Sequence, residues 1–178
     1  MAARAWDAVP ESDYEEVSRL LGRKPDGIFQ VVARSAPANL PAVIACWPII
    51  LPDRPMPTLF WLLDPRLTKE VSSLEAAGIV KEIRKSVDSQ DLSRVHARYA
   101  SIRDALIPPD YTGPRPSGGI GGTRGGFKCL HSHVAWYLMS KEDPVVAWVM
   151  EHYAGSLSID AVTVCDLPVG LRALNSSR

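Results

Sequence analysis

The chain has 178 residues, of which 46% are hydrophobic, and its 20 basic and 20 acidic side chains cancel. This length and composition predict one folded domain and exclude wholesale disorder. The neutral balance lacks the basic excess typical of proteins that bind duplex nucleic acid or anionic membranes, so we expect neither partner. The cysteines are few and widely spaced, at Cys46, Cys129 and Cys165, which argues against a secreted disulfide framework.

The N-terminal segment MAARAWDAVPESDYEE has no long apolar run, so we expect no signal peptide. The most apolar stretches, residues 40–51 and 57–63, fall short of the roughly 20 residues that span a bilayer. We therefore expect a cytoplasmic protein without a membrane span. The predicted organisation is a flexible leader over residues 1–11, a single α+β domain over residues 12–165 and a polar tail over residues 166–178.

The first half of the domain predicts one helix and three strands. Ser12 or Asp13 is suited to capping a short helix, because its side chain accepts a backbone N–H. Runs of β-branched and aromatic residues predict strands over residues 28–33, 41–47 and 57–63. The proline-rich segment before the third strand is a connection, and strands this close in sequence favour antiparallel pairing.

Helical periodicity dominates the second half. Leu67, Val71 and Leu74 lie at helical spacing, and Asp64 immediately before Pro65 is a plausible N-cap. The other predicted helices span residues 79–87, 92–106, 127–139 and 144–153. The fold class is therefore α+β, with a small antiparallel sheet of about three strands packed against the helices of the second half.

The stretch GGIGGTRGGFKCLHSHVAWYLM, residues 118–139, concentrates the polar chemistry of the chain. Free N–H groups at a helix N-terminus favour an anion, so Gly125, Gly126, Arg124 and Lys128 are the predicted anion-binding residues. The stretch is neither a Walker A loop, because no GK[ST] closes it, nor the dinucleotide fingerprint, because no strand leads into it. The alternative is a mobile lid or linker.

Cys129, His131 and His133 follow this glycine-rich segment directly. On a regular helix Cys129 and His133 share a face and His131 points away, so all three cannot ligate one metal. If Cys129 precedes the helix, however, Cys129 and His131 can converge. A zinc site needs four ligands, or three and a water. The candidates elsewhere in the chain are Asp64, His96 and His152. The alternative is a buried cysteine beside two ordinary histidines.

Nucleophilic catalysis is another hypothesis for the same residues. A cysteine near a helix N-terminus and close to Lys128 would have a lowered pKa, with His131 or His133 as base. The chain carries no local signature of a known cysteine hydrolase. A winged-helix DNA-binding reading of residues 74–84 is disfavoured by the neutral charge and by the strands that precede the helices.

Three strings, LLGRKPDG, PTLFWLLDP and GGTRGGFKCLH, together resemble the bacterial family catalogued as domain of unknown function 501, over roughly residues 19–150. The resemblance implies no activity, but it implies a metal site, because relatives often carry cysteine or histidine at four places. Asp64, Cys129 and His131 would fill three of them. The first place holds Ser35-Ala36 here instead of a cysteine, and a hydroxyl is a poor zinc ligand.

We therefore predict a cytoplasmic bacterial protein with a metal- or anion-binding site where Asp64, Cys129 and His131 meet. Zinc is the cofactor that these ligands favour, and its donor atoms should lie within about 4 Å of each other. The partner would be a small ligand or another protein. Two alternatives stay open: a non-enzymatic binding or scaffold protein whose site is only structural, and a thiolate- or metal-assisted hydrolase with Cys129 and His131 as candidate catalytic residues.

Overall fold

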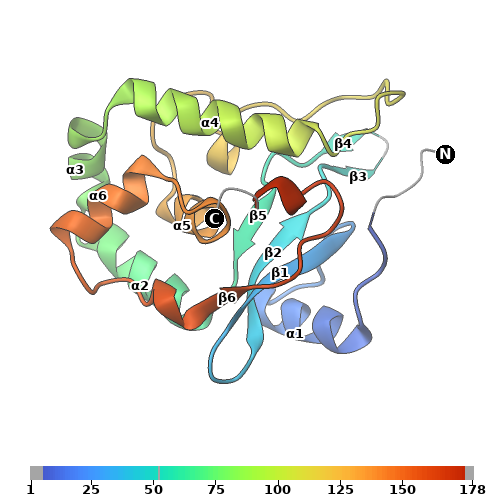
Figure 1. The fold of residues 1–178 in the computed structure, drawn as a ribbon, viewed down its shortest axis with the longest axis horizontal. Coiled ribbons are helices and arrows are strands. Elements are labelled where there is room, and N and C mark those ends of the chain that lie inside the picture. Colours follow the sequence, from blue (N-terminus) through green and yellow to red (C-terminus); the bar gives the residue numbers. More distant parts are fainter. Residues whose placement is uncertain (1–5, 52, 175–178) are drawn as a thin grey trace.

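The computed structural model describes residues 6–51 and 53–174. The helices are α1 (Glu11–Leu21), α2 (Pro65–Ala76), α3 (Ile79–Ser86), α4 (Ser89–Asp104), α5 (Leu130–Ser140) and α6 (Pro144–His152), with 3-10 turns η1 (Ile120–Gly122), η2 (Ile159–Ala161) and η3 (Arg172–Leu174). The strands are β1 (Phe29–Ser35), β2 (Leu40–Cys46), β3 (Ile49–Leu51), β4 (Arg54–Pro55), β5 (Phe60–Leu62) and β6 (Val162–Val164). The predicted α+β class is confirmed (Figure 1).

The main sheet is antiparallel throughout and has the order β5-β2-β1-β6. Its first three strands are those expected from the sequence. The fourth strand, β6, comes from the C-terminal part of the chain, and its Val162 pairs with Ser35 of β1. The proline-rich connection between β2 and β5 forms a separate two-stranded ribbon, β3-β4, which agrees with its exclusion from the sheet interior.

The helices of the second half begin where the sequence provides a cap. Asp64 caps α2 as predicted, since its Oδ1 accepts the N–H of Leu67 at 2.8 Å. Gly78, in a left-handed conformation with φ of 89°, separates α2 from α3. Asp143 caps α6 in the same way, and its Oδ1 accepts the N–H groups of Val145 and Val146.

Three predicted helix starts are wrong, and one of them is that of α4, which begins at Ser89 and not at Leu92. Helix α5 begins at Leu130 and not at Phe127, because Cys129 is extended, with φ of −149°, and stands at the N-cap position. Helix α1 begins at Glu11 after Pro10, so neither proposed residue caps it. Asp13 instead pairs with Arg34 of β1 at 2.6 Å.

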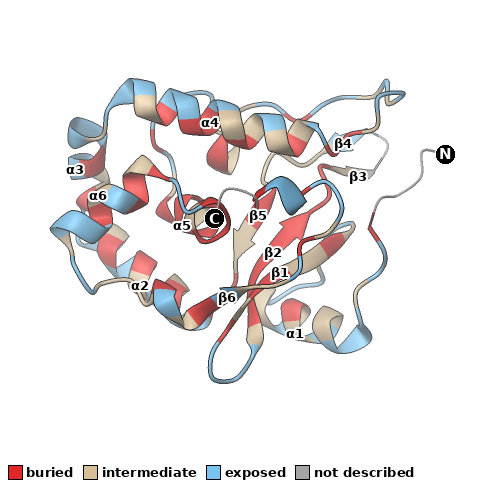
Figure 2. Ribbon diagram, viewed as in Figure 1, coloured by how far each residue is buried: buried red, intermediate tan, exposed pale blue. Residues whose placement is uncertain are grey.

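Helix α5 lies at the centre of the core. It packs against β5, and Figure 2 shows it buried on nearly every side. Its fully buried residues include Leu130, Val134, Trp136 and Leu138. Helices α2, α4 and α6 surround it, while α1 packs a second, smaller apolar cluster onto the sheet (Figure 1). The start of α5 is therefore held in place from several directions.

The packed domain is longer than the predicted range of residues 12–165. Trp6, in the expected leader, is only 4% exposed, and its Nε1 donates to the carbonyl of Val169 at 2.9 Å. In the expected tail, Leu167, Leu171 and Leu174 are buried in the main core. Residues 1–5 and 175–178 lie outside the described residues. Within the described part of the chain, no helix has the length and apolarity to cross a membrane.

Candidate metal centre

Three potential metal ligands meet where α2 faces the start of α5. They are Glu75, Cys129 and His131, each half-buried, and one donor atom from each lies within 4.8 Å of the other two. Cys129 and His131 converge because Cys129 precedes the helix, the condition stated from the sequence. In the described part of the chain, this is the one cluster of three such residues close enough to share an ion.

Helix α2 directs a row of polar side chains toward the start of α5. Thr68, Ser72 and Glu75 lie at spacings of four and three, so they share one face. The apolar stripe of Leu67 and Val71 lies beside it and is buried in the core. Because the apolar stripe anchors α2, the polar stripe is directed at the first turn of α5.

Hydrogen bonds and an ion pair orient Glu75 and His131. Glu75 Oε1 accepts the backbone N–H of Leu130 at 2.9 Å, and its Oε2 lies 3.4 Å from Nδ1 of His131. The other ring nitrogen of His131, Nε2, lies 3.3 Å from the hydroxyl of Ser72. The two nitrogens of the ring therefore lie beside different groups of α2, the Glu75 carboxylate and the Ser72 hydroxyl.

The electrostatics favour a charged thiolate–imidazolium pair. Burial raises the pKa of the Cys129 thiol, but interactions with the His131 ring and with the N–H and hydroxyl of Ser132 outweigh it, and the pKa is lowered. Contact with Cys129 raises the pKa of His131, with a further contribution from Glu75 against the opposing effect of burial. Burial instead raises the pKa of Cys46 to about 12, and it is also the main cause of the raised pKa of Cys165.

Asp64 does not join this cluster, which corrects the ligand set expected from the sequence. Asp64 is 2% exposed, and one of its carboxylate oxygens is committed to the N-terminus of α2. Glu75, almost three helical turns further along the same helix, stands in its place. Ser35, at the position of the expected family cysteine, lies at the end of β1 and is not a member of the cluster either.

Several N–H groups of the segment predicted to bind an anion are engaged within the segment itself. We call residues 118–126 the glycine loop. Its amides at Gly119, Gly122 and Thr123 donate to carbonyls within the loop, and that of Gly125 donates to the Thr123 hydroxyl at 3.3 Å. Lys128 donates to the carbonyl of Gly121 at 3.2 Å. Arg124 and Gly126 precede α5 by several residues, so they do not lie at its N-terminus.

The remaining histidines have partners outside the cluster. Both ring nitrogens of His96 contact the glycine loop. His133 is 1% exposed and its Nδ1 lies 2.8 Å from Asp143, deep in the core. His152 contacts the carbonyl of Trp148 on α6. None of the three is placed to complete the centre.

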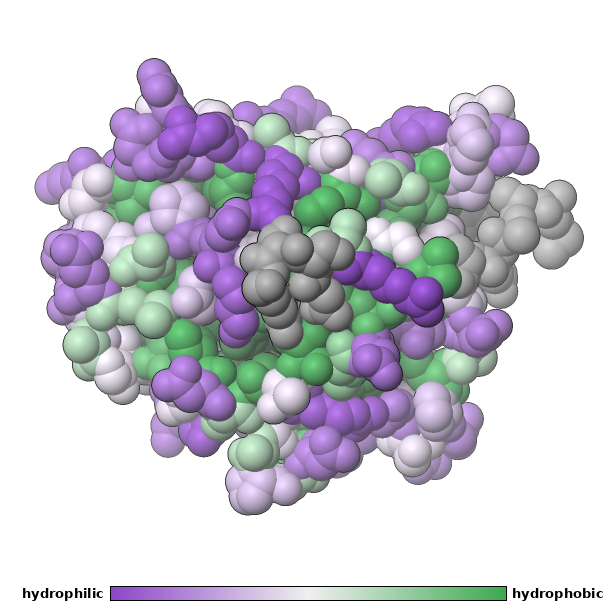
Figure 3. All heavy atoms as spheres, viewed as in Figure 1, coloured by the Kyte–Doolittle hydropathy of each residue, from purple (hydrophilic) through white to green (hydrophobic). Residues whose placement is uncertain are grey.

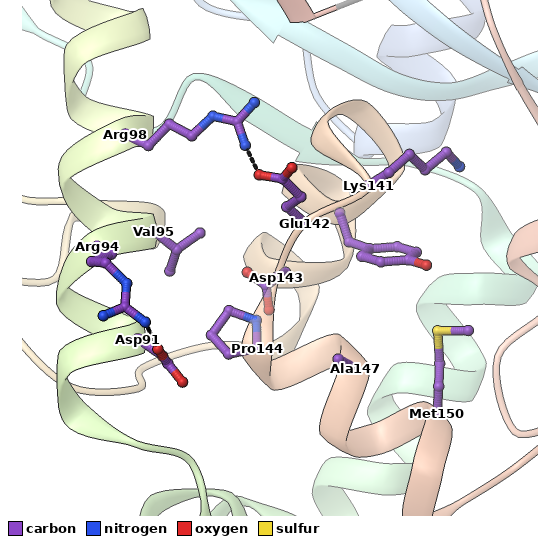
Figure 4. Close-up of a pocket in the computed structure, with 11 residues that line it drawn as sticks. Asp91, Arg94, Val95, Arg98, Lys141, Glu142, Asp143, Pro144, Ala147 and Met150 are labelled. Carbon is purple, nitrogen blue, oxygen red and sulfur yellow. Dashed lines mark hydrogen bonds and ion pairs between the residues drawn. The ribbon is translucent and has the colours of Figure 1, made fainter. Parts of the chain in front are cut away.

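A wide hollow of about 750 Å³ lies elsewhere, between α4, α6 and the turn that joins α5 to α6 (Figure 4). Its charged side chains are paired across or beside it: Arg98 of α4 with Glu142 of the turn, and Arg94 with Asp91. Two ion pairs therefore lie along these walls. Nothing in the lining matches the residues singled out from the sequence.

Few large hydrophobic side chains are exposed among the residues that the structure describes. On the face in Figure 3, hydrophilic side chains gather over α4, and hydrophobic ones are interspersed across the middle. Among the described residues, Met150 and Val169 are the large hydrophobic side chains that are well exposed. Isolated exposed hydrophobic residues are normal in a folded domain and do not mark a partner.

The comparisons with known proteins bear on the family and not on the chemistry. No curated protein and no solved structure matches the chain. One family model, described as a protein of unknown function (DUF501), matches residues 32–151. That range runs from β1 to α6 and contains Glu75, Cys129 and His131. The resemblance carried by PTLFWLLDP and GGTRGGFKCLH is thereby confirmed, and the chain belongs to the DUF501 family.

Proposed function

We propose that this protein binds one zinc ion through Glu75, Cys129 and His131, with water as the fourth ligand. The observation that carries the proposal is the convergence of a carboxylate, a thiol and an imidazole from two elements within 4.8 Å. All three groups are competent zinc ligands, and a sulfur together with a nitrogen favours zinc over magnesium or calcium. Glu75 takes the place that the sequence had suggested for Asp64.

The distances are compatible with a bound ion after a small contraction. Ligands about 2.0–2.3 Å from a tetrahedral zinc lie about 3.3–3.8 Å from each other. The separation of 3.4 Å between Glu75 Oε2 and His131 Nδ1 is already in that range. The donor atoms that are further apart, up to 4.8 Å, need to approach by about 1 Å. Half-buried side chains have the freedom to make that adjustment.

Neighbouring groups form hydrogen bonds with the proposed ligands His131 and Glu75, as groups around the ligands do in known zinc sites. If Nδ1 of His131 binds the metal, Nε2 is left to donate its proton to the Ser72 hydroxyl or to the carbonyl of Thr68. Glu75 can bind through Oε2 while Oε1 keeps the Leu130 N–H. The orientations of His131 and Glu75 are thus supported by groups that do not themselves contact the ion.

Three protein ligands and a water make an open site. This is the arrangement in which zinc lowers the pKa of bound water, so metal-assisted hydrolysis is the chemistry that the centre supports. The same ion would join α2 to the first turn of α5, and a purely structural role is the non-enzymatic alternative. The two roles share the ligand set and differ in whether the water exchanges for a substrate.

The lowered pKa of Cys129 favours a second candidate, a metal-free thiolate nucleophile. The orientation of the ring is less suited to it. In a nucleophile–histidine–acid arrangement the base places one nitrogen on the nucleophile and the other on the acid. Here Nδ1 is beside Glu75 and Nε2 is beside the Ser72 hydroxyl, so the nitrogen that contacts the Cys129 thiol is shared with one of these partners.

A zinc competition titration against a chromogenic chelator tests the proposal. We expect the wild-type chain to bind one equivalent, and Cys129→Ser to weaken binding at least about 100-fold, beyond the 10–100-fold typical of outer-shell changes. The matched control is Cys165→Ser, which removes a half-buried thiol outside the cluster and should leave the affinity unchanged. A wild-type chain that binds no zinc, yet is alkylated by iodoacetamide at Cys129 faster than at Cys165, would support the thiolate instead.

A further inference from the structure

His96 of α4 holds two separate points of the glycine loop. Its Nδ1 accepts the backbone N–H of Ile120 at 3.2 Å, and its Nε2 lies 2.9 Å from the carbonyl of Gly126. An amide can only donate and a carbonyl can only accept, so these partners assign the proton to Nε2 and leave Nδ1 bare. Both contacts therefore require the neutral ring in one tautomer.

The loop is fitted tightly against this ring. A Cβ atom at Gly119 would lie 2.4 Å from Cβ of His96, so no side chain larger than hydrogen fits there. Between the two anchored points, the loop passes over the start of α5. A Cβ atom at Gly121 would lie 3.2 Å from Oγ of Ser132 and 4.0 Å from Cβ of Cys129. The part of the loop that His96 fixes is thus the part that lies beside Cys129.

A second proton on the ring would break this arrangement. Protonated Nδ1 is a donor and would face the Ile120 N–H, another donor. Burial lowers the pKa of His96; His133 contributes in the same direction, while the Gly126 carbonyl and Asp143 oppose it. The other charged groups around the ring are Arg103, Asp104 and Arg124, which line the same hollow of about 380 Å³. The neutral form is present above pH 6.5 and is lost as pH falls through the lowered pKa.

We propose that His96 is a positioning residue that latches the glycine loop over the metal centre, and that protonation of its ring releases the loop. The latch itself stands on the contacts of His96; only the identity of what the loop covers rests on the proposed zinc site. Release would open the thiol and the fourth coordination position to solvent or to a ligand.

Hydrogen exchange of the Ile120 amide, measured by NMR and expressed as a protection factor, tests the latch without reference to metal. In the wild type we expect protection to fall about tenfold from pH 7.5 to pH 5.0, while the Leu138 amide in the centre of α5 stays protected. In His96→Asn the side-chain oxygen can still accept the N–H of Ile120 but cannot be protonated. The protection factor of the Ile120 amide in this variant should therefore not depend on pH. Wild-type protection that is constant over this range, or an equal fall in His96→Asn, would overturn the latch.

The rate of zinc release provides a second test of the latch. At pH 7.5 we expect His96→Ala to lose zinc to a chelator about tenfold faster than the wild type at unchanged stoichiometry, because the covering loop is free. His96→Asn should restore the slow release. Equal release rates in wild type and His96→Ala would contradict the latch. A wild type that binds no zinc would refute the proposed metal centre, while the amide protection would still decide the latch.

Discussion

Arg103→Ala is expected to lower the free energy of unfolding by about 3–5 kcal/mol. The guanidinium is 1% exposed and donates to the carbonyls of Pro57, Pro116 and Gly118 at 3.2, 3.3 and 2.7 Å. Its removal leaves three buried or half-buried acceptors without this donor, at about 1–3 kcal/mol for each group that stays unpaired. Urea unfolding of the two proteins measures the difference.

Arg94→Ala is the matched control for this variant. Arg94 lies on the same helix, is 72% exposed and pairs with Asp91 at the surface. Such a pair contributes about 0–1 kcal/mol, so the control should unfold almost as the wild type does. If Arg103→Ala lost less than about 1 kcal/mol, the carbonyls would have to find water or other donors, and Arg103 would not be the anchor of residues 116–118.

Glu75→Gln and Asp64→Ala should have opposite effects on metal binding and stability. Glu75→Gln keeps an oxygen for the Leu130 N–H but loses the anionic ligand, so zinc affinity should fall at least about 100-fold with little change in the stability of the zinc-free chain. Asp64→Ala removes the cap of α2 and should cost about 1–2 kcal/mol of stability while zinc affinity stays within a few-fold. Calorimetric titration and thermal unfolding separate the two quantities.

Asp64→Asn serves as the control, because asparagine also caps helices. It should recover most of the stability lost in Asp64→Ala. If zinc binding were lost in Asp64→Ala and retained in Glu75→Gln, Asp64 would be the third ligand. That result would contradict the assignment of Glu75 as a ligand at the start of α5.

The sequence was sufficient to predict the helices and strands whose pattern lies within one short stretch of the chain. The apolar stripe from Leu92 to Leu106 predicted α4, and the pair Asp64-Pro65 predicted the cap and start of α2. The strand β6 has only three residues and pairs with β1 about 130 positions earlier in the chain, so no local sequence pattern predicts this pairing. Its place in the sheet is decided by tertiary packing.

The centre itself could be predicted in part. Cys129 and His131 lie two residues apart, and a helix start after Cys129 was enough to bring them together. Glu75 was missed because an exposed polar stripe on a helix usually faces solvent. The signal available was the spacing of Thr68, Ser72 and Glu75, but only the fold shows that this stripe faces the start of α5.

The glycine loop illustrates how helix α4 organises an irregular segment. His96, Tyr99 and Arg103 follow one another at spacings of three and four, and each binds backbone groups outside the helix. Tyr99 accepts the N–H of Leu59, and the other two hold the glycine loop. A loop rich in glycine predicts mobility from composition alone, whereas two buried side chains of one helix fix it here.

X-ray absorption of the zinc-loaded protein tests the central claim most directly, because it reports the atoms bound to the ion. We expect one sulfur at about 2.3 Å and three nitrogen or oxygen atoms at about 2.0–2.1 Å, with the sulfur shell absent in any residual complex of Cys129→Ser. A shell of oxygen and nitrogen atoms without sulfur in the wild-type protein would contradict a centre built from Glu75, Cys129 and His131.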